Sequence, residues 1–292
     1  MKKEISLPQR KSKLSFFVVA TVTLLVLASI FAYFYLSGSA LPKAAIIDQL
    51  SSSTLNDPPS RYVNTTFIET AKNLLYERFS SVDYYSENAT IENYKRLASL
   101  GYKLIIWRAH SALHNETGNQ HIAICSSDYY YGQDYEPTVT LCNIAGDPRL
   151  YIAITASFIK EVMHGSFTDT VIVFMSCNGL KEGYTKTAQV FVEKGAKAFV
   201  SWTGWIGSAD NDDAITMFLS YLIYGNNSIS QAVSKIPMYN STLFGSSRLS
   251  YYPAEAADYH IPDYRQTRTG ASSFLAVKAF SKKKFLLRRS FR

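Results

Sequence analysis

The sequence predicts an α/β fold with a doubly wound, mostly parallel sheet flanked by helices. Short apolar runs between polar residues, such as Val171–Met175 and 104–107, are typical of strands buried on both faces. Helical patterns separate these runs and end at glycines, as at Gly195. The 292 residues, 47% hydrophobic and 18% charged, suffice for one large domain. Alternating strands and helices favour a parallel sheet with right-handed crossovers.

The elements follow from local patterns along the chain. Residues 44–48 predict a first strand, and residues 51–64, with a Pro-Pro pair, predict a loop. Thr66 and Glu69 form a capping-box pattern at the start of a helix. The next predicted elements are a strand at 82–85, a helix from Thr90 to Leu100, strands at 104–107 and 171–175, a helix at 184–194, a strand at 198–202, helices at 208–224 and 228–235, and a last strand at 272–280.

The segment between the third and fourth strands holds an insertion. Residues 121–125 and 138–142 are extended patterns around a Tyr-rich bend, and we expect them to form a β-hairpin beyond the sheet edge. Residues 152–163, after an extended piece at 150–153, predict the crossover helix that leads back to the sheet.

The N-terminal region predicts a membrane anchor. Residues 14–36 carry no charge and are long enough to span a bilayer, whereas the apolar region of a signal peptide is shorter. Cleavage after Ala40 is the alternative. Five basic residues precede the run, so the positive-inside rule places residues 1–13 in the cytoplasm. The predicted organisation is a cytoplasmic segment at 1–13, a signal-anchor helix at 14–36, a linker at 37–42, an extracytoplasmic domain at 43–280 and a basic tail at 281–292.

Glycosylation patterns agree with an extracytoplasmic location. Five Asn-x-Ser/Thr sites are candidates, namely Asn64, Asn88, Asn115, Asn226 and Asn240. The tail at 281–292 mixes basic residues with Phe and Leu, and either lies on an anionic membrane surface or is a solvated tail.

The net charge of +7 does not indicate a nucleic-acid partner. Basic residues at the two ends of the chain outnumber this net charge, so the middle of the chain is mildly acidic. They are Lys2, Lys3, Arg10, Lys11 and Lys13 near the start, and Lys282, Lys283, Lys284, Arg288, Arg289 and Arg292 at the end.

Two chemically active side chains follow predicted strands. His110 comes after the strand at 104–107, and Cys177 follows the strand at 171–175. If these strands are parallel neighbours, both residues reach the edge where open α/β sheets bind ligands. An imidazole beside a thiolate makes an activated nucleophile. The alternative is a buried free cysteine, which packs like a small hydrophobic residue.

The strand ending at His110, the sequence Ser176-Cys177-Asn178-Gly179 and the block at 190–202 together resemble the caspase-like cysteine peptidases. This clan includes caspases, legumains, gingipains, clostripain and separases. The block is most similar to the gingipain and CHAT branches, in which a Gly-Ala pair ends the helix after the cysteine. The similarity covers about residues 43–235.

The resemblance implies an endopeptidase that needs no cofactor and acts on peptide or protein substrates. Cys177 would be the nucleophile, and His110 would protonate the leaving amine. The backbone N–H groups of Ser111 and Cys177 would form the oxyanion hole. Family members usually carry glycine after the histidine. Ser111 therefore leaves open an inactive relative that serves as a binding module.

The resemblance also suggests a substrate pocket. The residue after the first strand often lines the pocket for the side chain before the cleaved bond, which here points to Asp48. A carboxylate there favours Arg or Lys, although Asp48 is alternatively a turn or capping residue. Trp202 and Trp205 are the candidate pocket wall.

The remaining two cysteines are candidates for a disulfide. If Cys177 stays a free thiol, Cys125 and Cys142 can pair in an oxidising exterior. Facing positions on two hairpin arms would bring them within disulfide range, and the bond would contribute about 3 kcal/mol. Two unpaired core cysteines are the alternative.

The sequence gives little support to a metal site. It has no CxxC or HExxH motif. The residues at 210–213, Asp-Asn-Asp-Asp, resemble a DxD metal motif of an anchored glycosyltransferase, which we keep as a less favoured alternative. The acidic first turn of a helix explains them more simply. The other histidines are expected at the surface, namely His114, His121, His164 and His260.

Overall fold

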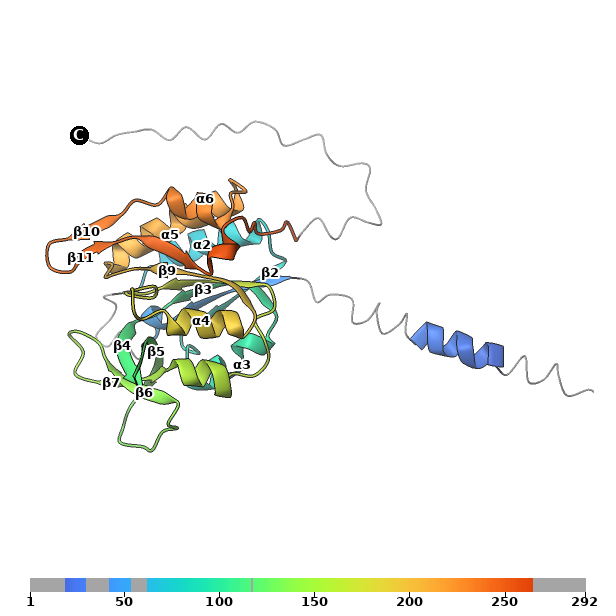
Figure 1. The fold of residues 1–292 in the computed structure, drawn as a ribbon, viewed down its shortest axis with the longest axis horizontal. Coiled ribbons are helices and arrows are strands. Elements are labelled where there is room, and N and C mark those ends of the chain that lie inside the picture. Colours follow the sequence, from blue (N-terminus) through green and yellow to red (C-terminus); the bar gives the residue numbers. More distant parts are fainter. Residues whose placement is uncertain (1–18, 30–41, 54–61, 117, 265–292) are drawn as a thin grey trace, which may run out of the picture. The chain divides into compact units, whose positions relative to one another are not determined.

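The computed structural model describes residues 19–29, 42–53, 62–116 and 118–264 of the chain. Figure 1 shows the arrangement of its elements. Two units, 1–41 and 42–292, are distinguished by their internal contacts. The first contains a helix at 19–29, within the predicted anchor. None of the helices in the described ranges is both long and apolar enough to cross a membrane. The rest of the predicted anchor, the predicted last strand at 272–280 and the tail at 281–292 lie outside the described residues.

The second unit is built on a six-stranded sheet with the order β12-β9-β8-β3-β1-β2. The strands are β1 (Lys43–Asp48), β2 (Ser81–Tyr85), β3 (Tyr102–Arg108), β8 (Thr170–Met175), β9 (Ala196–Trp202) and β12 (Leu249–Tyr252). All neighbours pair in parallel except β12, which runs antiparallel to β9. The predicted α/β class with a mostly parallel sheet is therefore confirmed, whereas β12 was not predicted.

Helices cover both faces of this sheet because alternate residues of each strand point to opposite sides. In β3, Leu104 and Ile106 pack against one set of helices, and Ile105 and Trp107 pack on the other face. Figure 1 shows α2, α5 and α6 on the first face and α3 and α4 on the second. The helices are α2 (Thr65–Tyr76), α3 (Ile91–Arg96), α4 (Lys186–Glu193), α5 (Ser208–Ile223) and α6 (Ile229–Ser234), with single turns at Gln49–Ser51, Leu97–Ser99 and Ala254–Ala256.

Helix α2 begins earlier than its predicted capping box. Asn64 is the N-cap, and its side-chain oxygen accepts a hydrogen bond of 3.0 Å from the N–H of Phe67. The predicted cap of α3 is confirmed, because the hydroxyl of Thr90 accepts from the N–H of Asn93. Asparagine is as good a cap as serine or threonine, so the local pattern at Thr66 was ambiguous.

The predicted hairpin is wrong, because the insertion is a four-stranded antiparallel sheet with the order β4-β5-β7-β6. Its strands are β4 (Ser111–Glu116), β5 (Asn119–Tyr129), β6 (Val139–Asn143) and β7 (Leu150–Ile154). The two expected hairpin arms, β5 and β6, are separated by β7. A separate short pair, β10 (Tyr239–Ser241) and β11 (Gly245–Ser247), forms a hairpin elsewhere.

The predicted crossover helix at 152–163 is also corrected. Residues up to Ile154 belong to β7, and only a short π-helix, Phe158–Val162, follows before β8. The extended piece predicted at 150–153 is thus a full strand. The apolar residues of β7 are buried in the sheet. A short apolar run of this kind fits a buried strand or a buried helix, and it was interpreted as a helix.

Candidate functional site

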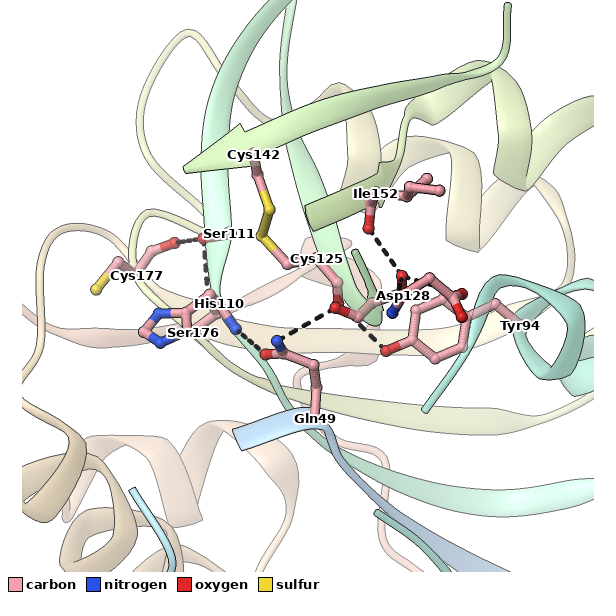
Figure 2. Close-up of a disulfide and its surroundings, with 11 residues drawn as sticks. Gln49, Tyr94, His110, Ser111, Cys125, Asp128, Cys142, Ile152, Ser176 and Cys177 are labelled. Atoms are coloured by element: carbon pink, nitrogen blue, oxygen red, sulfur yellow. Dashed lines mark hydrogen bonds between the residues drawn. A yellow bond between two sulfur atoms is a disulfide. The ribbon is translucent and has the colours of Figure 1, made fainter. Parts of the chain in front are cut away.

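The carboxyl ends of β3 and β8 bring the two predicted chemical groups to one pocket. These strands are parallel neighbours in which Arg108 lies opposite Met175. His110 and Cys177 each follow two residues after this pair, so they leave the sheet at the same edge. Both line a pocket of about 460 Å³, and Figure 2 shows their side chains on the same side of the strand ends.

The turn after Cys177 explains the sequence at 176–179. Asn178 has a positive φ of 59° and its N–H donates to the carbonyl of Gly204. Gly179 lies so close to the side chain of Ser201 that a Cβ would clash with it. A residue larger than glycine does not fit at position 179. The turn at Asn178 and Gly179 directly follows Cys177 and fixes its position at the end of the strand.

The thiol of Cys177 is half-buried against residue 206. The N–H of Ile206 donates to the sulfur at 3.5 Å, and the thiol faces the carbonyl of the same residue at 3.6 Å. Burial raises the pKa of Cys177, and the N–H of Ile206 opposes this change to a smaller extent. The resting side chain is therefore a neutral thiol at neutral pH, and it needs a base to become a nucleophile.

His110 is held by its backbone and by an aromatic contact. Its N–H donates to the side-chain oxygen of Gln49 at 3.0 Å, and its carbonyl accepts from the N–H of Cys125 at 3.0 Å. The imidazole contacts the ring of Tyr62 edge to face, with centroids 4.9 Å apart. Figure 2 shows Gln49 linking the His110 backbone to the second sheet.

Ser111 ties the two strand ends together. Its hydroxyl donates to the carbonyl of Cys177 at 2.7 Å and accepts from the hydroxyl of Ser176 at 2.8 Å (Figure 2). The side chain that departs from the family pattern is therefore used to fix the peptide of the candidate nucleophile.

Four segments provide most of the pocket lining, at 109–111, 143–145, 175–177 and 205–208. Sequence reasoning anticipated Trp205 in this wall, and the structure places it there. Phe244 and Asn211 were missed, although both line the pocket. Phe244 stacks on Trp205 with centroids 4.8 Å apart. No local signal marks Phe244, because it reaches the pocket from the distant β10–β11 turn.

Two predicted pocket residues lie elsewhere. Trp202 is fully buried in the core, where its indole N–H donates to the side-chain oxygen of Asn211 at 2.8 Å. Asp48 is also fully buried, and its carboxylate binds Arg108 at 2.8 Å and accepts from the hydroxyl of Tyr84. Neither lines the pocket, so the assignment of Trp202 and Asp48 to the substrate wall is corrected.

Arg108 binds a second carboxylate, that of Asp212, through two hydrogen bonds of 2.7 and 2.9 Å. Asp212 lies in the first turns of α5 and is the second aspartate of the predicted DxD-like motif. Its carboxylate is thus already engaged by the guanidinium that also binds Asp48. Across the described ranges, no group of three His, Cys, Asp or Glu side chains is placed to hold a metal ion.

The predicted disulfide between Cys125 and Cys142 is confirmed, with Cα atoms 6.5 Å apart (Figure 2). It joins β5 to β6 across the intervening β7, and does not link the arms of one hairpin. Cys142 is followed directly by the pocket segment at 143–145, and Cys125 bonds to the backbone of His110. The disulfide therefore links two parts of the pocket frame.

The glycosylation candidates differ in exposure. The side chains of Asn88, Asn115, Asn226 and Asn240 are exposed. Asn64 is half-buried, and its amide nitrogen donates to Asp212 at 3.0 Å. In the folded protein, the Asn64 nitrogen is therefore engaged in a structural contact.

One expectation about the histidines is also wrong. His121 is buried, and its ring lies 5.0 Å from that of His114 across the β4–β5 pair.

Comparison with known proteins does not assign the chain to a family. No family model matches the chain, and no curated protein gives a significant match.

Proposed function

We propose that this chain is a membrane-anchored cysteine endopeptidase of the caspase-like clan, with Cys177 and His110 as its catalytic pair. The observation that carries the proposal is the shared pocket at the carboxyl edge of β3 and β8. A thiol and an imidazole line it together, and both come from the ends of neighbouring parallel strands. This edge is where open α/β sheets bind ligands.

The proposed reaction uses each group in turn. His110 takes the thiol proton of Cys177, and the sulfur attacks the carbonyl carbon of the peptide. The protonated imidazole then gives its proton to the amine as the C–N bond breaks, which leaves a thioester. Water, deprotonated by His110, hydrolyses the thioester and regenerates the thiol.

The backbone N–H groups of Ser111 and Cys177 are proposed donors to the oxyanion that forms during attack. The hydroxyl of Ser111 holds the carbonyl of Cys177 at 2.7 Å, which fixes the orientation of the peptide after Cys177. This contact orders the chain directly after the proposed Cys177 donor, whose N–H belongs to the preceding peptide.

The caspase-like assignment has two further supports. The histidine strand and the cysteine strand are adjacent in the sheet in the expected order. Gly195, with a φ of 100°, ends the segment after α4, and Ala196 begins β9, as the resemblance implies. The anchor at 14–36 and an extracytoplasmic location remain part of the proposal, supported by hydropathy and by the disulfide.

A second candidate is a caspase-like binding module without catalysis. It is favoured by the raised pKa of Cys177, whose burial keeps the sulfur protonated. In such a module the pocket would still bind a peptide, but no bond would be cleaved.

Hydrolysis of a peptide library by the full-length protein separates these candidates. Cys177→Ala and His110→Ala should each lower activity by at least about 10³-fold, because each removes one half of the pair. Both variants should remain folded, since neither residue belongs to the buried core. His114→Ala is the matched control, because His114 lies on the adjacent strand β4 outside the pocket, and it should keep near wild-type activity.

The assignment would be overturned if either pocket variant retained wild-type hydrolysis. Binding of library peptides by wild type without any cleavage would favour the binding module.

A further inference from the structure

The pocket beside Cys177 is lined by uncharged side chains apart from the titratable groups of His110 and Cys177. Among the described residues that line it, none is Asp, Glu, Lys or Arg. Its walls include the apolar residues Leu50, Ile144, Met175 and Ile206. A volume of about 460 Å³ lies within the range of small-ligand sites, so it can hold a bulky side chain.

Three polar side chains of the pocket are engaged in other contacts. The hydroxyl of Ser111 donates to the Cys177 carbonyl and accepts from the hydroxyl of Ser176. The side-chain oxygen of Asn211 accepts from Trp202. None of these groups carries a charge that could pair with an ionised substrate group, and burying an unpaired ion is costly.

The buried charged residues Asp48, Arg108 and Asp212 do not line the pocket. Arg108 is shared by Asp48 and Asp212 at hydrogen-bond distances, and all three residues are at least 97% buried. None of them lines the pocket, so neither sign of charge is presented to a substrate from this group.

The mouth of the pocket carries a pair of exposed aromatic rings. Trp205 and Phe244 are stacked at 4.8 Å and are 48% and 55% exposed. An apolar ligand that covers this exposed apolar surface removes it from water, which favours binding. Aromatic rings also favour further aromatic contacts, which adds to the benefit of an apolar occupant.

We propose that this pocket selects peptides with a bulky apolar side chain next to the cleaved bond, and that Trp205 and Phe244 set this preference. The inference rests on the proposed peptidase function and names its substrate class. It replaces the preference for Arg or Lys that Asp48 suggested, because Asp48 is buried and paired.

A basic side chain stacked on Trp205 is the competing occupant. A cation–π contact is favourable, and it is stronger where the cation is desolvated. In a pocket without a carboxylate, this gain is opposed by the cost of removing the cation from water. The balance therefore favours leucine, methionine or phenylalanine over lysine or arginine.

The test uses peptidyl acyloxymethyl ketones that differ only in the residue next to the ketone: phenylalanine, leucine, lysine or aspartate. The Cys177 sulfur forms a C–S bond to the methylene carbon and displaces the carboxylate, which leaves with its bonding electron pair as the thiol proton is released. Full-length protein should react at least about tenfold faster with the phenylalanine and leucine probes than with the charged probes. Iodoacetamide measures access to the thiol without a peptide.

Variants assign the preference to the aromatic pair. Trp205→Ala and Phe244→Ala should each slow the phenylalanine probe about tenfold while leaving the iodoacetamide rate unchanged. Leu243→Ala is the matched control, because Leu243 is 84% exposed on the same turn but does not line the pocket. It should react like wild type.

Fastest labelling by a charged probe, or an unchanged phenylalanine rate in both aromatic variants, would overturn the inference and leave the peptidase proposal standing. If iodoacetamide labels Cys177 but no peptide probe does, the peptidase function itself fails, and the inference fails with it.

Discussion

Two clusters of polar residues lie at the same edge of the central sheet and behave differently. In the ion-pair cluster, Arg108 binds Asp48 and Asp212, and all three are buried. In the pocket cluster, His110 and Cys177 line an open pocket. The ion-pair cluster takes Asp48 and Arg108 from the ends of β1 and β3 and Asp212 from α5. His110 and Cys177 follow the ends of β3 and β8. The two clusters differ in burial and in pairing.

The difference teaches how to separate a structural cluster from a chemical one. Charges that are removed from water must be matched, because an unpaired buried ion is strongly unfavourable. In the ion-pair cluster one guanidinium binds two carboxylates through short hydrogen bonds, so these three side chains hold the fold together. The pocket cluster remains accessible from outside, which a reacting group requires.

Breaking the ion-pair cluster should have the largest effect on stability. Arg108→Met leaves two buried carboxylates without their partner, so we expect a loss of about 3–5 kcal/mol in the free energy of unfolding, measured by urea denaturation. The same substitution in an Asp48→Asn/Asp212→Asn background is the control and should cost much less. A loss under about 1 kcal/mol for Arg108→Met alone would remove the distinction between the clusters.

The disulfide between Cys125 and Cys142 stabilises the segments around the pocket cluster. Replacing Cys125 and Cys142 with alanine should lower the free energy of unfolding by about 3 kcal/mol, because the reduced unfolded chain has more freedom. Activity should fall as well, since the segment at 143–145 follows Cys142 in the pocket wall. Thermal melting with and without reductant checks this, and wild type that is insensitive to reductant would contradict it.

Asn64 connects α2 to the ion-pair cluster. Asn64→Ala removes both the helix cap and the hydrogen bond to Asp212, so we expect a loss of about 1–2 kcal/mol in the free energy of unfolding. Thr90→Ala, which removes a cap without a buried partner, should cost less.

Glycopeptide mass spectrometry should find Asn64 unmodified in the folded protein, and full occupancy of Asn64 by a glycan would contradict its half-buried placement.

The ionisation of Cys177 should have the smallest effect on the free energy of unfolding. Its pKa is raised above the ordinary 9.0 by burial, so alkylation by iodoacetamide should have a midpoint above pH 9. A folded pKa above the unfolded value contributes stability that is fully present below the unfolded pKa and is lost as pH rises through the folded pKa. Above pH 9, wild type should therefore lose stability relative to Cys177→Ala. A midpoint well below 9 would show an activated resting thiolate instead.

The two sheets show where sequence prediction succeeded. Several strands of the parallel sheet are continuous apolar runs such as Val171–Met175, which the local pattern reveals. The strands β3 and β8 pair although the four strands of the second sheet lie between them in the chain. The prediction of the antiparallel segment was wrong because β7 lies between β5 and β6. No local sequence pattern encodes this order of strands. The position of His110 and Cys177 at one edge of the sheet was predictable because each follows the end of one of two adjacent parallel strands.

The sequence by itself determined the parallel sheet, the edge that carries His110 and Cys177, and the identity of the paired cysteines. These depend on periodicity, strand ends and residue chemistry, which are local. Only the tertiary structure decided that Asp48 pairs with Arg108, that Trp202 is buried and that Phe244 stacks on Trp205. Each of these facts depends on contacts between residues far apart in the chain, because burial and pairing arise only when distant segments pack together.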